Sequence, residues 1–183
     1  MAKLLSKDQQ KFLLSLARRA IEHHLKTGKP LNVKIKDEDL QEKRGAFVTL
    51  KVDDQLRGCI GYPLPYKSLY ETIMDVAVSA ATQDYRFQPL AQEELSKTTI
   101  EISVLSLPKP IKDVQEIEVG KHGIIVSKEP FKGLLLPQVP VEWNWDLETY
   151  LGHGCLKAGL AEDEWKKGAL IEIFSAQVFS EEK

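Results

Sequence analysis

The first element that the hydrophobic pattern predicts is an amphipathic helix near the start of the chain. Between residues 6 and 27, apolar side chains recur at the three- and four-residue spacing of a helix. These positions are Phe12, Leu13, Leu16, Ala17, Ala20, Ile21 and Leu25. Ser6 and Gln9 occupy the positions of a capping box, and Gly28 follows the last turn. The pattern therefore predicts a helix over about residues 6–27 with one face on the core.

A two-residue period replaces the helical one from residue 46 onward. The apolar positions of this segment are Ala46, Val48, Leu50 and Val52. Residues 53–55 then form a short reversal, which makes residues 56–61 the return arm of a β-hairpin. Because a strand projects alternate side chains to opposite faces, we expect Leu56 and Ile60 to lie in the core.

The rest of the pattern predicts a helix, a strand, a hairpin, a second helix and a final strand. These elements cover about residues 68–81, 98–107, 124–136, 147–158 and 169–179. The buried stripe of the first of these helices is rich in alanine, which indicates close packing against a sheet. Gly152 and Gly154 each cost the second helix about 1 kcal/mol relative to alanine, so we expect a bend or a close contact there.

The length and charge of the chain limit the number of domains and the kinds of partner that we expect. A chain of 183 residues can bury a proper core, and we expect a single domain over residues 1–183. Its 25 basic and 27 acidic side chains lack the excess of positive charge that nucleic acids attract in bulk, so nucleic acid is disfavoured as a partner. No apolar run approaches the roughly 20 residues of a membrane span. Two distant cysteines predict reduced thiols and a cytoplasmic location.

Reactive chemistry is concentrated in the LRGCIG segment at residues 56–61. Alternation places Arg57 and Cys59 on one face, so the guanidinium is a candidate to stabilise a nucleophilic thiolate. The alternative is that Cys59 is a small buried side chain. His122 and His153 are the histidines outside the first helix and the candidate bases. With Cys155, these residues have no metal-ligand spacing, so we expect no metal site.

Arg57 has two interpretations that the sequence leaves open. Its planar guanidinium suits a carboxylate or phosphate of a ligand, and it equally suits a structural ion pair with Asp84, Glu101 or another internal acid. Gly58 is expected on the core-facing side of the strand, where the missing side chain lets the alanine-rich helix approach. Gly61 is likewise read as structural, with a phosphate-binding role as the alternative.

Asp84 and Arg86 lie where the alanine-rich helix ends. Charged residues at helix ends usually pair with each other or with backbone groups, and we expect this of both. Arg86 is in addition a candidate ligand for an anion.

Six segments, in this order along the chain, resemble the AMMECR-type domain, whose bacterial and archaeal members are called AmmeMemoRadiSam system protein A. They are LRGCIG at 56–61, DYRFQPL at 84–90, EISVL at 101–105, GKHG at 120–123, LPQV at 136–139 and CLKAGL at 155–160. The resemblance implies an α+β fold of two intimately joined lobes, each a mostly antiparallel sheet covered by helices, with a cleft near LRGCIG. It implies association with Memo-like and radical-SAM proteins, and neither a defined reaction nor a cofactor.

Two functional hypotheses from different classes follow. In the first, a cleft binds a small anionic or nucleotide-like ligand. The residues that would line it are Arg57, Gly58, Cys59, Gly61, Asp84 and Arg86. Its catalytic form makes Cys59 the nucleophile and has His122 or His153 move the proton. In the second, the protein is a non-catalytic adaptor that docks a Memo-like or radical-SAM protein. The sequence leaves open whether the protein is an enzyme.

Overall fold

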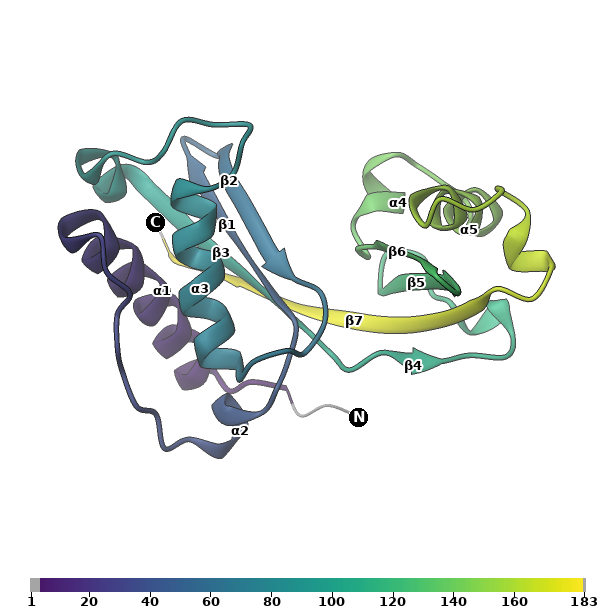
Figure 1. Ribbon diagram of the computed structural model, residues 1–183, viewed down its shortest axis with the longest axis horizontal. Coiled ribbons are helices and arrows are strands. Elements are labelled where there is room, and N and C mark those ends of the chain that lie inside the picture. Colours follow the sequence, from purple (N-terminus) through teal and green to yellow (C-terminus); the bar gives the residue numbers. More distant parts are fainter. Residues whose placement is uncertain (1–3, 183) are drawn as a thin grey trace. The chain divides into compact units, whose positions relative to one another are not determined.

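The structure is a computed structural model that describes residues 4–182. It divides into two compact units (Figure 1). Unit 1 contains the described residues up to 105 together with those from 177 onward, and unit 2 contains residues 106–176. The long last strand, β7 (Leu170–Ser180), contributes residues to both units.

Unit 1 is a mostly antiparallel sheet with helices on one face (Figure 1). Its strand order is β2-β1-β3, and β3 neighbours β7. The strands are β1 (Ala46–Val52), β2 (Gln55–Tyr62) and β3 (Thr98–Leu105), and the helical elements are α1 (Lys7–Thr27), α2 (Glu38–Gln41), α3 (Leu69–Thr82) and the 3₁₀ turn η1 (Gln92–Lys97). Helices α1 and α3 pack on each other and on this sheet, and the buried core lies between them and the strands.

Helix α1 begins and ends where its sequence predicts. The Ser6 hydroxyl accepts a hydrogen bond from the Gln9 N–H, and the Gln9 side chain accepts one from the Ser6 N–H, so the capping box is complete. Gly28 ends the helix in the left-handed region at φ 68°, which glycine adopts without strain. The predicted helix over residues 6–27 is confirmed.

The hairpin of β1 and β2 contains a β-bulge that the sequence pattern misses. Leu50 lies opposite Gly58, but Lys51 lies opposite Leu56, so Arg57 is the extra residue. The bulge interrupts the alternation of faces at this point. As a result the Leu56 side chain is 42% exposed, and the prediction that it lies in the core is wrong.

Beyond the bulge the alternation holds. Ile60 packs against the core of unit 1, as predicted. Gly58 faces α3 so closely that an added Cβ would lie 2.1 Å from the carbonyl oxygen of Ala80. The predicted close approach of the alanine-rich helix to Gly58 is therefore confirmed.

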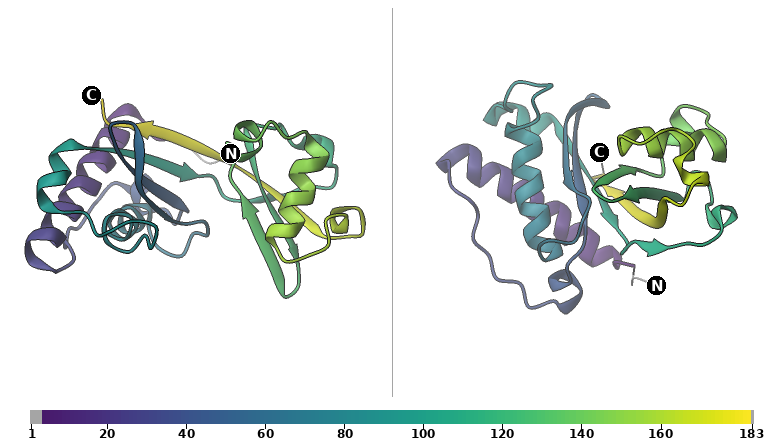
Figure 2. Two further views of the ribbon diagram at one scale, coloured as in Figure 1. Left: turned by 90° about the horizontal axis from the view of Figure 1, so that it is seen from above. Right: turned by 45° about the vertical axis from the view of Figure 1, so that its right-hand side comes forward.

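Unit 2 has its own antiparallel sheet, helices and core (Figure 2). Strand β5 pairs with β6 on one side and with the first part of β7 on the other, and β4 also pairs with β7. The further elements are β4 (Lys109–Pro110), β5 (His122–Lys128), β6 (Phe131–Leu135), α4 (Val139–Glu142), α5 (Leu147–Lys157) and the 3₁₀ turns η2 (Val114–Glu116) and η3 (Glu164–Lys166). The sequence pattern misses α2, α4 and β4, which have four residues or fewer.

Helix α5 runs without interruption through its two glycines. Asp146 caps it by accepting a hydrogen bond from the Thr149 N–H at 2.8 Å. A Cβ on Gly154 would lie 2.8 Å from the Cδ1 atom of Ile124 on β5. Of the two expectations for this helix, the close contact is confirmed.

Among residues 4–182, none of the helices combines the length and the apolar composition that crossing a bilayer requires.

Candidate functional site

The Cys59 segment lies on β2, at the edge of the unit 1 sheet. An edge strand leaves backbone N–H groups without a neighbouring strand to accept their hydrogen bonds. Here the Cys59 N–H donates to Oδ2 of Asp84 at 2.8 Å. Asp84 follows the C-terminus of α3, so this bond ties the helix end to the edge strand.

Asp84 is a buried carboxylate that is held mainly by Arg86. The Nη2 and Nε atoms of Arg86 donate to its two oxygens at 2.7 and 2.9 Å, and the Arg86 backbone N–H donates at 3.2 Å. The pKa of Asp84 lies far below its usual range, first because of the Arg86 side chain and then because of the backbone N–H groups of Cys59 and Arg86, despite burial. The pairing that the sequence predicts for Asp84 and Arg86 is present.

Arg57 forms an ion pair within unit 1. Its Nε and Nη2 atoms each lie 3.1 Å from an oxygen of Glu94, and Nη1 donates to the Gln88 carbonyl at 2.9 Å. The side chain is 18% exposed. The hydrogen bond from Arg57 is the main reason that the pKa of Glu94 lies below its usual value. Its acidic partner is thus Glu94, which no sequence pattern links to residue 57.

A double-mutant cycle tests the structural role of this pair. We expect the variants Arg57→Ala, Glu94→Ala and the double variant to give a coupling free energy of about 1 kcal/mol in urea unfolding, since the pair is partly exposed. A coupling near zero would contradict a stabilising role for the pair.

The Cys59 thiol is half-buried on the sheet face opposite α3. It lies across from Thr49, whose hydroxyl donates to Sγ at 3.2 Å. A second polar contact on this face is the Lys51–Glu101 ion pair at 2.9 Å. Arg86 is electrostatically coupled to the thiol: the pKa of Arg86 is raised first by the hydrogen bond to Asp84 and in smaller part by the charge of Cys59.

The two glycines of the motif have structural contacts. Gly58 faces α3, away from the thiol. A Cβ on Gly61 would lie 2.2 Å from the ring of Phe47 and 2.6 Å from the carbonyl oxygen of Ala46. Both positions therefore require glycine for packing, whatever binds nearby.

The candidate bases His122 and His153 lie in unit 2, whereas Cys59 lies in unit 1. Nδ1 of His122 accepts a hydrogen bond from the Glu118 N–H at 3.1 Å. The His153 ring stacks on Trp145, with centroids 3.9 Å apart and planes 2° from parallel. Both rings thus have local structural contacts, and a role in proton transfer stays a prediction.

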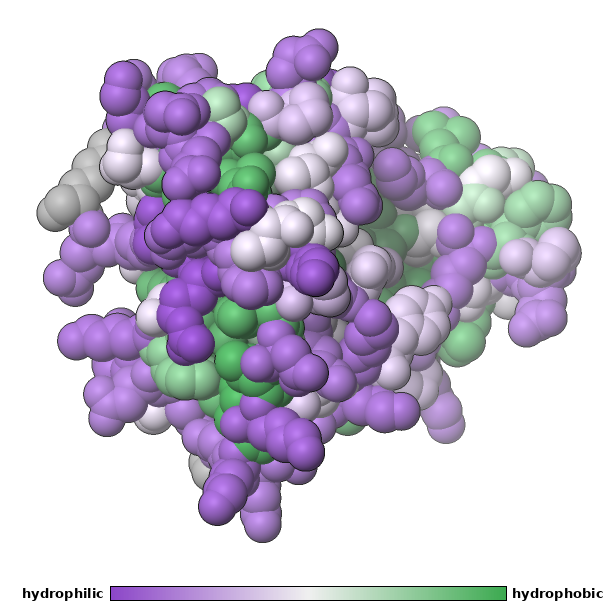
Figure 3. Space-filling view, turned by 60° about the vertical axis from the view of Figure 1, so that its left-hand side comes forward, coloured by the Kyte–Doolittle hydropathy of each residue, from purple (hydrophilic) through white to green (hydrophobic). Residues whose placement is uncertain are grey.

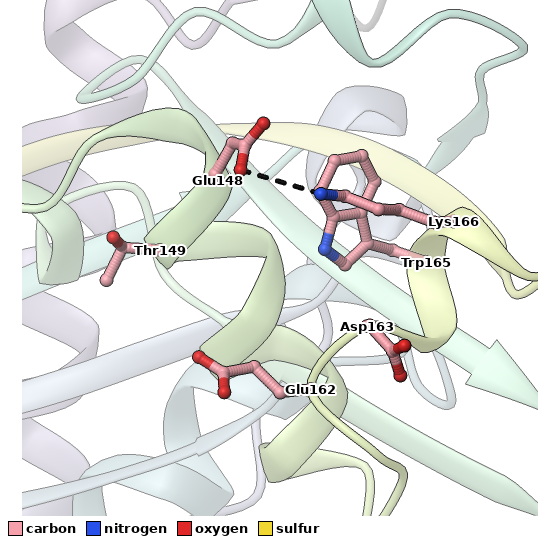
Figure 4. A pocket seen from close by; sticks show the side chains of 6 residues that line it. All are labelled: Glu148, Thr149, Glu162, Asp163, Trp165 and Lys166. Carbon is pink, nitrogen blue, oxygen red and sulfur yellow. Dashed lines mark ion pairs between the residues drawn. The ribbon is translucent and has the colours of Figure 1, made fainter.

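Surface hollows lie in both units. Figure 4 shows one of about 390 Å³ in unit 2, where Lys166 lies over the Trp165 ring and pairs with Glu148 at 3.6 Å. The hollow is completed by Thr149, Glu162 and Asp163. Two hollows of unit 1 lie along α1 and beside η1. None of these three hollows is lined by Arg57 or Cys59.

Within residues 4–182, no group of three or more histidine, cysteine or acidic side chains could hold a metal ion.

Comparison with known proteins decides the family. The profile of the AMMECR1 family matches residues 14–179, which include every motif described above. The chain belongs to the AMMECR1 family. The resemblance that the six motifs carry is thereby confirmed, and so is the predicted α+β fold with mostly antiparallel strands.

Relatives of this AMMECR1-family protein cover almost its whole length. It is 49% identical over 193 residues to Protein MK0488 of Methanopyrus kandleri, across 100% of this chain and 93% of that protein. It is 43% identical to Protein MJ0810 of Methanocaldococcus jannaschii, across 98% and 93%. The crystal structure of the uncharacterized protein PH0010 from Pyrococcus horikoshii matches with a TM-score of 0.86 and 43% identity, covering 97% of this chain and 94% of that one. These names describe no ligand or reaction.

Proposed function

We propose that the Cys59 segment of this AMMECR1-family protein binds a small anionic or nucleotide-like ligand, with Arg86 as the anion contact. The observation that carries the proposal is the hydrogen-bond inventory of the two arginines. Arg57 uses Nε, Nη1 and Nη2 on internal acceptors. Arg86 is 44% exposed and bonds Asp84 through Nε and Nη2, so its Nη1 has no hydrogen-bond partner among residues 4–182. A guanidinium N–H pair that lacks an internal acceptor suits a phosphate or carboxylate oxygen.

The thiol is the candidate reactive group of the site. The Thr49 hydroxyl lies 3.2 Å from Sγ of Cys59, and in the catalytic form of the proposal the thiolate of Cys59 is the nucleophile. Cys59 and Cys155 are both free thiols, which supports the reducing cytoplasm as the proposed location.

Differential alkylation tests the proposal, with the second cysteine as an internal control. Cys155 is buried, and burial raises the pKa of its thiol. We therefore expect iodoacetamide to modify Cys59 at least about tenfold faster than Cys155 in the folded protein, as read by mass spectrometry. Inorganic phosphate or adenosine monophosphate is expected to slow the modification of Cys59 and to raise the melting temperature.

The variants separate binding from catalysis. Cys59→Ser removes the alkylation signal but leaves the thermal shift with phosphate, whereas Arg86→Gln removes the shift. A Cys59 that reacts no faster than free cysteine across the pH range contradicts the catalytic form. The absence of both protection and thermal shift with these probes contradicts the binding proposal.

The second candidate function is the adaptor, and an exposed tryptophan favours it. In unit 2 the Trp143 side chain is 68% exposed next to the exposed Val141, and tryptophan is enriched among the residues that carry binding energy in protein interfaces. The resemblance implies a Memo-like or radical-SAM protein as the partner. Binding to such a protein that Trp143→Ala weakens, while Arg86→Gln does not, supports the adaptor.

A further inference from the structure

The connection from α1 to α2 carries an alternating pattern of its own. We call residues 29–36 the strap. Leu31, Val33 and Ile35 are half-buried and pack against the core of unit 1. Lys34 and Lys36, at the intervening positions, are exposed. The strap therefore holds its apolar side chains inward and directs its lysines to solvent, as an extended chain on a core does.

The strap leads from the end of α1 back to α2 (Figures 1 and 2). It starts after Gly28, where α1 ends, and Leu31 lines a hollow of about 260 Å³ with side chains of the last turns of α1. These side chains are Arg19, Glu22, His23 and Lys26. Just beyond the strap, Asp37 accepts a hydrogen bond at 3.1 Å from Nε2 of Gln9, in the first turn of α1. The two ends of the connection therefore lie beside α1, with Leu31 next to its last turns and Asp37 next to its first turn.

Positive charge is concentrated in the second half of α1 and in the strap. Residues 18–36 contain six basic side chains and a single acidic one, Glu22, although the whole chain has 25 basic and 27 acidic side chains. The six are Arg18, Arg19, Lys26, Lys29, Lys34 and Lys36. Arg18 pairs with Glu181 and Lys26 with Glu22, both at 2.6 Å. Among residues 4–182, the other four have no ion-pair partner.

The near-neutral charge of the whole chain therefore does not describe residues 18–36, which are rich in basic side chains. Overall composition disfavours a protein that attracts nucleic acid from all sides, but it does not exclude one surface with uncompensated cations. Figure 3, in which the side of the molecule with α1 comes forward, is coloured largely as hydrophilic. The basic region ends toward α2, where the acidic residues Asp37, Glu38 and Asp39 follow.

We propose that the outer face of α1 and the strap bind single-stranded nucleic acid through its phosphates. Lys34 and Lys36, two residues apart on an extended chain, are spaced by about 6.5 Å, close to the separation of successive phosphates along a strand. Phe12 is 39% exposed on α1 and lies seven residues before Arg19, and so on nearly the same face. An aromatic ring beside a row of cations is the combination that binds unpaired bases and their backbone.

An anionic membrane surface is the alternative partner for these basic residues, and it fits the structure of α1 less well than a nucleic acid does. Helices that lie in a bilayer surface insert a broad apolar face. The apolar face of α1 is already buried against the unit 1 core, where Leu13, Leu16 and Ile21 are at most 1% exposed. A single strand of nucleic acid uses both the cations and the exposed ring of Phe12.

Salt dependence of RNA binding tests this inference on the full chain. The probe is a fluorescein-labelled oligouridylate of about 20 nucleotides, followed by anisotropy between about 50 and 200 mM salt. Four cations that each displace about 0.7 counterion predict a slope of log K against log salt of about −3. Binding that does not depend on salt would overturn the proposal.

Charge-matched variants distinguish binding by α1 and the strap from attraction by the net charge of the whole protein. Lys34→Glu with Lys36→Glu is expected to weaken binding at least about tenfold and to reduce the slope by about 1.4. Lys112→Glu with Lys157→Glu changes the net charge equally at exposed unit 2 positions, and we expect less than about a twofold loss. Arg19→Gln is a milder variant with the same expected direction, and circular dichroism confirms that each variant is folded.

Besides salt-independent binding, two further results would overturn the proposal. The first is equal weakening by the two charge-matched pairs, which would assign binding to net charge alone. The second is tighter binding to phosphatidylserine vesicles than to the oligouridylate, with the same sensitivity to the strap lysines. Because Cys59 and Arg86 are unchanged in these variants, failure of this test leaves the ligand proposal for Cys59 standing.

Discussion

Gly58→Ala is expected to destabilise unit 1 by about 3 kcal/mol. The new Cβ would lie 2.1 Å from the carbonyl oxygen of Ala80, which belongs to the backbone of α3 and cannot rotate aside as a side chain does. Either β2 or α3 must therefore shift, and the buried residues between α3 and the strands lose contacts. Alanine differs from glycine here by one methyl group, so the loss measures how closely helix and sheet approach.

Urea unfolding followed by circular dichroism measures this loss, and the next residue provides the control. Cys59→Ala changes the same strand on its opposite face and adds no volume, so we expect a cost below about 1 kcal/mol. Equal stability of Gly58→Ala and the unmodified protein would contradict the close contact. A large loss from both variants would point instead to a general sensitivity of the edge strand.

Asp84→Asn is the second substitution with a large expected effect. We expect it to lower the free energy of unfolding by about 2–4 kcal/mol at neutral pH. Asparagine keeps the size of the side chain but removes the charge. Arg86 then loses its ion-pair partner, and one of the two oxygens that accept from Arg86 and from the Cys59 N–H becomes a donor. A buried network that is only partly satisfied is costly.

The same carboxylate makes stability depend on pH in a predictable direction. The pKa of Asp84 is lower in the folded protein than in the unfolded chain, so the unfolded chain takes up the proton first as the pH falls. The stabilisation is therefore complete above about pH 4 and is lost progressively as the pH falls toward the lowered folded pKa. We expect the difference in unfolding free energy between the unmodified protein and Asp84→Asn to shrink below that pH.

A surface carboxylate on the same helix provides the matched control. Asp75 of α3 pairs with Lys67 and is partly exposed, so Asp75→Asn is expected to cost at most about 1 kcal/mol. If Asp75→Asn and Asp84→Asn lower the free energy of unfolding equally, the hydrogen bonds of Asp84 at the edge strand stabilise the protein no more than a surface ion pair does. The contrast matters for function because Asp84 holds both the strand of Cys59 and the guanidinium of Arg86.

Local signals in the sequence were sufficient for the long elements. The capping box of Ser6 and Gln9 and the glycine after Thr27 delimit α1, because the interactions that begin and end a helix involve residues within one turn. The alternation in β1 and the alanine stripe of α3 likewise depend only on spacing along the chain. The six motifs were sufficient for the family.

The candidate site was only partly accessible from the sequence. Cys59, Asp84 and Arg86 were all identified, and the structure brings them together. The partner of Arg57 was not, since Glu94 lies 37 residues away and the choice among several acids depends on how the chain folds back. The exposure of Leu56 was wrongly predicted because a one-residue bulge leaves no mark on the hydrophobic pattern.

The sequence by itself thus determined the long helices, the long strands and the family, since each is encoded by neighbouring residues. Only the tertiary structure decided that Arg57 forms an internal ion pair and that, among residues 4–182, Nη1 of Arg86 has no hydrogen-bond partner. It also decided that Leu31 of the strap lines the same hollow as Arg19 and Lys26 of α1. The physical reason is that ion pairing and surface charge depend on distances in space between residues far apart along the chain.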